Sequence, residues 1–189
     1  MDLAEKLATK PQFVSPTSVL AELGVTSGMN VIDYACGAGH WSIAAAKLIA
    51  PKGMLLAIEN DINMLSMLKS RAESEKLNNI EVEELELEKG ISRLAKPSDV
   101  VIVSNILHLI KDKGSFAVKA VKMVNTKGQL LFIDWVARET LFGPPLKLRV
   151  KQEQVIELFE KAGMHFVKTV DAGIDHFGLV FDCKGNKND

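Results

Sequence analysis

Apolar, β-branched runs alternate with helix-type patterns along almost the whole chain, and this alternation limits the fold more than any other feature. A strand–helix–strand repeat with right-handed crossovers gives a parallel sheet covered by helices on both faces. The predicted strands cover 31–35, 54–58, 80–87, 99–104 and 129–134, and the predicted helices cover 41–50, 62–77, 115–124 and 152–162. The 80–87 run alternates apolar with acidic residues, which places it near a sheet edge.

Two more strand patterns, 165–170 and 178–183, follow without a helix between them. Strands joined in this way pair antiparallel, so we expect a terminal hairpin. The sequence therefore predicts an α/β fold, namely one doubly wound, Rossmann-like domain with a seven-stranded, mostly parallel sheet and an antiparallel C-terminal hairpin. No repeat or linker interrupts the pattern, so residues 1–189 are expected to form a single domain with a core over about 15–184.

Charge and cysteine usage exclude several classes of partner. The 189 residues include 23 basic and 24 acidic side chains, and proteins that bind nucleic acid through phosphates carry a basic excess. We expect no nucleic-acid partner. No apolar run approaches the roughly 20 residues that span a bilayer, and the N-terminal residues lack the apolar centre of a signal peptide, so a cytoplasmic protein is expected. Cys36 and Cys183 lie outside any Cys/His cluster, and no metal site is predicted.

The first strand runs through a glycine-containing turn, Asp33-Tyr-Ala-Cys-Gly37-Ala-Gly39, directly into a helix. Glycines let the backbone pass close beneath a ligand, and the helix N-terminus offers N–H groups to an anionic group. Glu59 stands twenty residues beyond Gly39, at the end of the second strand, where a carboxylate can accept hydrogen bonds from both ribose hydroxyls of an adenosine ligand. These residues predict a nucleoside site at the carboxyl ends of the strands.

The identity of the nucleoside cofactor stays open on these features alone. A dinucleotide fingerprint requires a third small residue after the G-x-G turn, and Ser42 occupies that position. A nicotinamide dinucleotide is therefore disfavoured without being excluded.

Segment 31–41 resembles the first motif of class I S-adenosylmethionine (SAM)-dependent methyltransferases, in which an acidic residue precedes a G-x-G turn. Segments 57–65, 79–87, 103–108 and 126–135 resemble later motifs of that family in the same order, and the likeness covers about residues 15–184. At Ala35 the family commonly has glycine. The resemblance implies SAM as cofactor and S-adenosylhomocysteine (SAH) as product.

The resemblance also assigns parts of the cofactor to individual positions. It implies that the methionine part is bound by Asp33, Ala35, Gly37, Gly39, His40 and Trp41. It implies that the adenosine part is bound by Glu59, Asn60, Glu86 and Leu87, and that Ser104 and Asn105 form the wall of the cleft.

Methyl transfer from a sulfonium needs a nucleophile held in line, and a base only where the acceptor is protonated. His108, just after the fourth strand, is the candidate base. The alternative is a histidine that caps the next segment or packs against the adenosine pocket. His176, in the terminal hairpin, is expected in a surface turn, with a position facing the cleft as the alternative. Lys147, Arg149 and Lys151 are expected on a solvated face, with steering of an anionic substrate as the alternative.

The segment after the fourth strand, Ser104-Asn-Ile-Leu, lacks the Asn/Asp-Pro-Pro-aromatic run of family members that methylate amino groups in nucleic acids and proteins. Residues 143–163 resemble the quinone-methylating type of small-molecule enzyme. We therefore predict a methyltransferase acting on the O, C or S nucleophile of a small molecule. The alternatives are a nicotinamide-dependent oxidoreductase and a non-catalytic SAM-binding protein. The sequence does not determine whether the chain forms a homodimer.

Overall fold

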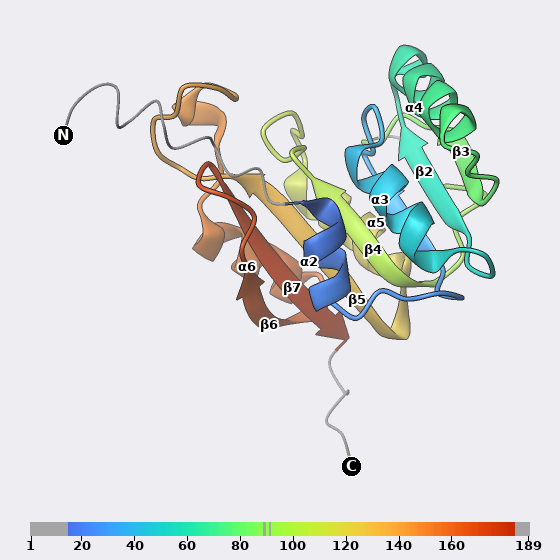
Figure 1. Ribbon diagram of the computed structural model, residues 1–189. Helices are drawn as coiled ribbons and strands as arrows, with labels where there is room; N and C mark the ends of the chain where they lie inside the picture. The colour runs from blue at the N-terminus through green and yellow to red at the C-terminus, as the bar shows by residue number, and fades with distance from the viewer. Residues whose placement is uncertain (1–14, 89, 91, 184–189) are drawn as a thin grey trace.

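Seven strands form one sheet in the order β3–β2–β1–β4–β5–β7–β6 (Figure 1). The computed structural model describes residues 15–88, 90 and 92–183, so the ends of the predicted domain lie outside the described residues. The strands are β1 (Val31–Tyr34), β2 (Leu55–Glu59), β3 (Ile80–Glu84), β4 (Ser98–Ser104), β5 (Val124–Trp135), β6 (Met164–Val170) and β7 (His176–Cys183).

The strand pairings confirm the predicted topology. Strands β1 to β5 pair in parallel, whereas β7 runs antiparallel to both β5 and β6. Strand β3 lies at one edge of the sheet, as its alternating pattern predicted. The chain order reverses between β1 and β4, and ligands of doubly wound sheets bind beyond the carboxyl ends of the strands at such a switch point.

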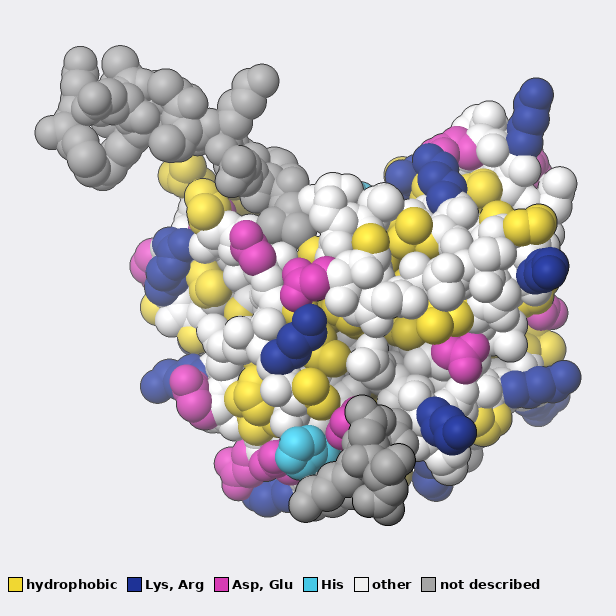
Figure 2. All heavy atoms as spheres, turned by 60° about the horizontal axis from the view of Figure 1, so that its bottom comes forward, with side chains coloured by type: hydrophobic (Ala, Val, Ile, Leu, Met, Phe, Trp, Pro, Cys, Tyr) yellow, Lys and Arg dark blue, Asp and Glu magenta, His cyan; other side chains and the backbone are white. Residues whose placement is uncertain are grey.

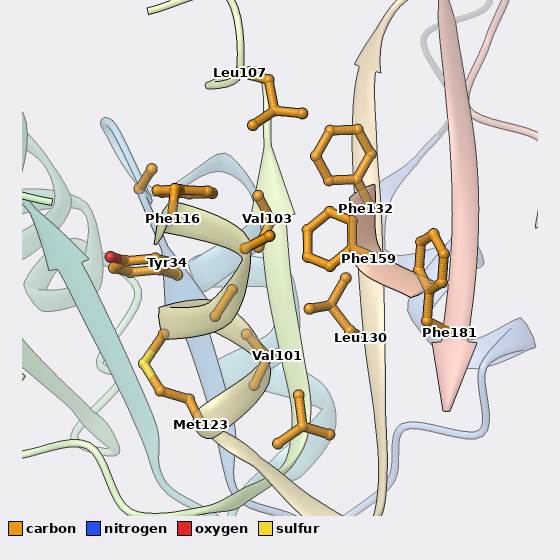
Figure 3. Packing of buried hydrophobic residues seen from close by; sticks show 14 of the residues in the cluster. Tyr34, Val101, Val103, Leu107, Phe116, Met123, Leu130, Phe132, Phe159 and Phe181 are labelled. Carbon is orange, nitrogen blue, oxygen red and sulfur yellow. The ribbon is translucent and has the colours of Figure 1, made fainter. Parts of the chain in front are cut away.

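The helices cover the sheet on two faces, and two buried clusters mark these layers (Figure 1). Side chains of α2, α3 and α4 belong to one cluster, and side chains of α5 and α6 belong to the other. In Figure 3, Phe116 of α5 lies against Tyr34 of β1, and their rings stack at 4.9 Å. The helices are α2 (Pro16–Glu22), α3 (His40–Ile49), α4 (Ile62–Ser74), α5 (Lys113–Lys122) and α6 (Gln152–Lys161), and the 3₁₀ helix η1 covers Leu146–Leu148.

Several elements differ from the prediction. Helix α2 carries only seven residues and was not predicted; it begins at Pro16, whose fixed φ suits a first helical position. Strand β3 ends at Glu84, before the predicted 87. Strand β5 begins at Val124, earlier than predicted, but residues 125–128 still turn: the β4–β5 register passes from Ser98 and Val124 to Val100 and Gln129, so these residues form a bulge. Lys127 N donates to Asn125 Oδ1 at 2.9 Å within it.

Charged side chains of both signs are interspersed on the face that Figure 2 shows, as the balanced composition suggests. Among the residues that the structure describes, none of the helices has the length and apolar character needed to cross a bilayer.

Candidate functional site

A cleft of about 440 Å³ opens at the carboxyl ends of β1, β2 and β4. Its lining comes from three segments, which are the turn after β1, the end of β2 with the start of α4, and the loop after β4. The volume falls within the range of about 300–1,000 Å³ that is usual for small-molecule sites. The cleft is thus large enough for a nucleoside ligand.

The turn after β1 is held in a left-handed backbone conformation. Ala35, Gly37 and Gly39 have φ values of 71°, 52° and 80°. Such a φ is costly for alanine, and strain of this kind concentrates at functional sites. The turn is fixed to neighbouring elements, because Ala35 N donates to the Ile58 carbonyl at 2.9 Å and an Arg71 guanidinium nitrogen donates to the Ala38 carbonyl at 3.0 Å.

Asp33 lies in β1 beneath this turn and is fully buried. Its Oδ2 accepts a hydrogen bond from the Ser42 hydroxyl at 2.6 Å, whereas Oδ1 is buried without a partner among the described residues. Burial raises the pKa of the Asp33 carboxyl to about 7. Ser42, which breaks the dinucleotide fingerprint, therefore has a specific task in this site as the hydrogen-bond donor to Asp33.

Glu59 ends β2 and connects the two walls of the cleft. Its Oε2 accepts from Gly37 N at 2.9 Å, and its Oε1 accepts from Asn60 N at 2.7 Å and from Asp61 N at 3.2 Å. An ionised carboxylate has about four acceptor positions, so these three bonds orient the group and leave capacity for a ligand hydroxyl. The carboxylate lines the cleft directly across the glycine turn.

The third wall follows β4. Asn105 has a φ of 52°, and its N–H donates to the Ile133 carbonyl at 2.9 Å. Of the three non-glycine residues with positive φ in the described part of the chain, two, Ala35 and Asn105, line the cleft. Leu109 completes this wall with an exposed apolar side chain.

The structure places most of the predicted cofactor residues in this cleft. Asp33 and Gly39 lie outside its lining, Asp33 within β1 and Gly39 packed on Leu68 as the N-cap of α3. The predicted residues that line the cleft are Ala35, Gly37, His40, Trp41, Glu59, Asn60, Ser104 and Asn105.

Glu86 and Leu87 are not brought to the cleft. Glu86 is exposed after β3. Leu87 is buried, and its carbonyl accepts from the Tyr34 hydroxyl at 3.1 Å and from Lys119 Nζ at 3.2 Å.

Six residues line the cleft without having been predicted from the sequence. The only sequence signal for them is that they lie within, or directly next to, the segments that resemble the family's motifs. They are Cys36, Ala38, Asp61, Met64, Ile106 and Leu109.

His108 and Asp134 lie at the same edge of the sheet, outside the cleft lining. Asp134 is buried, and its carboxylate accepts from Trp135 N at 2.8 Å and from Leu107 N at 3.3 Å, which ties the loop after β4 to the end of β5. Burial raises the pKa of Asp134 to about 6. His108 is half-buried, and burial, followed by the charges of Arg149 and Lys113, lowers its pKa.

Two expectations for this edge are wrong. Arg149 is half-buried, and its guanidinium donates five hydrogen bonds to residues 136–144, so it is not part of a solvated face. It also lies 5.4 Å from the centre of the Trp135 ring. His176 begins β7 instead of lying in a surface turn, and its ring packs on Trp135 at 4.1 Å. Lys147 and Lys151 are exposed as expected.

A seven-stranded doubly wound sheet with a reversed last strand, together with a glycine turn facing an acid, defines the class I SAM-dependent methyltransferases. A family model described as a methyltransferase domain matches residues 25–171. This chain belongs to that methyltransferase domain family, whose cofactor is SAM.

The structure is similar to the crystal structure of a SAM-dependent methyltransferase from Aquifex aeolicus, with a TM-score of 0.80 and 25% identity over 96% of this chain and 98% of the other. It also resembles the fold of a putative type 11 methyltransferase from Sulfolobus solfataricus, with a TM-score of 0.73 and 22% identity over 94% and 97% of the two chains. Among curated proteins, the demethylmenaquinone methyltransferase of Staphylococcus aureus (strain JH9) is 36% identical over 56 residues, which are 30% of this chain and 23% of that relative.

Proposed function

We propose that this chain transfers the methyl group of SAM to the O, C or S nucleophile of a small molecule. The observation that carries the proposal is the hydrogen bond from Gly37 N to Glu59 Oε2, at 2.9 Å, in a cleft of about 440 Å³. This hydrogen bond holds the Glu59 carboxylate, the proposed acceptor for the ribose hydroxyls, against the glycine turn. The turn is open enough for the methionine part of the cofactor.

The residues of the cleft fit SAM. A Cβ built on Gly37 would meet nothing within 4 Å, so the turn leaves room above it. The unpartnered Oδ1 of Asp33 can accept from the cofactor's amino end through a bridging water. Glu59 would accept from the ribose, and Asn60 would lie against the adenine. Glu86 and Leu87 form no part of this proposal, because both lie outside the cleft lining.

SAM supplies an electrophilic methyl group when bound, so the protein's task is to orient the acceptor and exclude water. Ser104 and Asn105 form the wall on the acceptor side, and Ile106 and Leu109 close it with apolar surface. His108 follows on the same loop. A lowered pKa keeps its ring neutral at neutral pH, so the ring can accept a proton from an acceptor hydroxyl or thiol.

A small-molecule acceptor is supported by the name of the partial relative, whose substrate is demethylmenaquinone. It is also supported by the loop after β4, which lacks the Pro-Pro-aromatic run.

The test is to incubate the protein with SAM and a panel of hydroxyl, thiol and carbon nucleophiles and to measure SAH release. Release that depends on an acceptor supports the proposal, and at a limiting SAM concentration Glu59→Gln should lower it while Glu84→Gln, an exposed acid at the end of β3, should not. Binding of SAM without release from any acceptor would favour the non-catalytic alternative. Absence of SAM binding would refute both.

A further inference from the structure

Helix α4 contacts the glycine turn after β1 at two successive residues. Nη1 of Arg71 donates to the Ala38 carbonyl at 3.0 Å. The side chain of Leu68 packs closely on Gly39, where an added Cβ would lie 2.3 Å from Leu68 Cδ1. Residues three apart lie on the same face of a helix, so Leu68 and Arg71 approach the turn together. Neither of them lines the cleft, whereas Ala38 does, so the contact of Arg71 with a ligand in this cleft is indirect.

The peptide unit between Ala38 and Gly39 is held at both of its ends. Its carbonyl accepts from Arg71, and its N–H, which belongs to Gly39, donates to the Cys36 carbonyl at 2.9 Å. The N–H of Ala38 itself has no hydrogen-bond partner in the part of the chain that the structure describes. Because Ala38 lines the cleft, this N–H is a donor that a ligand can use.

The local sequence does not by itself set the conformation of the turn. Ala35, Gly37 and Gly39 all have positive φ, which is costly at the alanine, and such a backbone persists only where surrounding contacts hold it. Among the described residues, Arg71 is the only one outside the turn whose side chain donates a hydrogen bond to its backbone. A charged donor makes a stronger bond than a neutral one. The Arg71 bond is therefore well suited to hold the turn.

Two side chains of opposite charge hold neighbouring residues of the turn. The Glu59 carboxylate accepts from Gly37 N, and the Arg71 guanidinium donates to the Ala38 carbonyl. Glu59 lines the cleft, so a bound ribose would share its carboxylate with the turn, whereas the bond from Arg71 does not compete with a ligand. Burial and then the charge of Arg71 lower the pKa of His40, a lining residue, which is consistent with a guanidinium close behind the cleft wall.

Resting on the proposed placement of the cofactor, we propose that Arg71 is a positioning residue for SAM. By holding the Ala38 carbonyl, it keeps the turn in the conformation that leaves the Ala38 N–H available to the methionine part of the cofactor. It touches neither the cofactor nor the reacting atoms. Without this bond the peptide unit between Ala38 and Gly39 can rotate, so the cofactor has to order the turn when it binds, and this cost lowers its affinity.

The test compares Arg71→Gln, Arg71→Lys and Lys69→Gln with the wild type. Calorimetry gives the affinity for SAH, and backbone amide NMR of the ligand-free proteins reports the conformation of the turn. Arg71→Gln, whose side chain is shorter and uncharged, should weaken SAH binding about tenfold and shift the Gly37 and Gly39 amides before any ligand is added. Arg71→Lys retains a charged donor for the same carbonyl and should bind within about threefold of the wild type.

Lys69→Gln is the matched control, because it removes an exposed charge from the same helix, and it should behave like the wild type in both measurements. Unchanged amides of β6 show that each variant is folded.

Four results would overturn the inference. They are unchanged SAH affinity in Arg71→Gln, no recovery of affinity in Arg71→Lys, an equal loss in Lys69→Gln, and a loss of affinity in Arg71→Gln without any shift of the Gly37 and Gly39 amides in the free protein. The last result would mean that Arg71 contacts the cofactor directly. If the wild type binds no SAH, the proposed function fails and this inference fails with it. If the wild type binds SAH and Arg71→Gln binds it equally well, only this inference fails.

Discussion

Asp33→Asn should change the pH dependence of stability in a direction that the structure fixes. Burial raises the pKa of the Asp33 carboxyl from 3.8 to about 7. The native state therefore holds a proton that the unfolded chain has lost between these two pH values, so stability falls as pH rises through that window. At about 1.4 kcal/mol per pH unit, the full effect above pH 7 is about 4 kcal/mol at most. The asparagine does not titrate and should lack this slope.

The assay is urea unfolding of both proteins at several pH values. Between pH 5 and pH 7 the stability of the variant relative to the wild type should rise by about 2 kcal/mol, whatever constant cost its buried amide adds. Taking the difference between the two proteins removes the contribution of Asp134, whose raised pKa acts in the same direction. Glu81→Gln, an exposed acid on β3, is the control and should show no such trend. A difference that is flat with pH, or that falls as pH rises, would refute the account of Asp33.

Three further predictions concern the walls of the site. Glu59→Gln should weaken SAH binding at least about tenfold, measured by calorimetry, because it removes the carboxylate that we propose accepts from the ribose; unchanged affinity would exclude Glu59 from the site. Gly39→Ala should destabilise the fold by about 2 kcal/mol more than Gly24→Ala in chemical unfolding. Both glycines have φ near 80°, but only the Cβ at Gly39 would lie 2.3 Å from Leu68 Cδ1, so equal losses would contradict the packing. Arg149→Lys keeps the positive charge but loses the guanidinium N–H groups that bond to the loop after β5, so the loop should loosen and proteolysis within residues 136–148 should become faster. Unchanged cleavage would show that the loop does not depend on these bonds.

The strand pattern was predictable because each buried parallel strand carries its own continuous apolar run. The parallel sheet and the terminal hairpin followed from the connections, whereas the order of the strands was not predicted. The extension of β5 to Val124 was not predictable, since Asn125 and Gly128 are turn residues by type. They form a bulge within the strand, opposite Asp99, whose Oδ1 accepts from Asn125 Nδ2 at 2.8 Å.

The parts of the site that could be predicted are those whose functional residues lie next to a recognisable strand end in the sequence. The turn at Gly37 and the acid at Glu59 each carry a signal within a few residues of a strand end, and the structure brings them into contact. The roles of Arg149 and His176 were not predictable, because each depends on packing against Trp135 from a distant segment. Ser42 was considered only as a departure from the dinucleotide pattern, although its hydroxyl serves Asp33.

The central claim is that SAM lies between the glycine turn and Glu59. Its most direct test is a titration of ¹⁵N-labelled protein with SAH, followed by backbone amide NMR. The Gly37 amide, which donates to Glu59, and the Asn60 and Asp61 amides should shift strongly and saturate together, while the amides of β6 should not move. Saturable shifts confined to another surface, or no shifts at all, would contradict the claim.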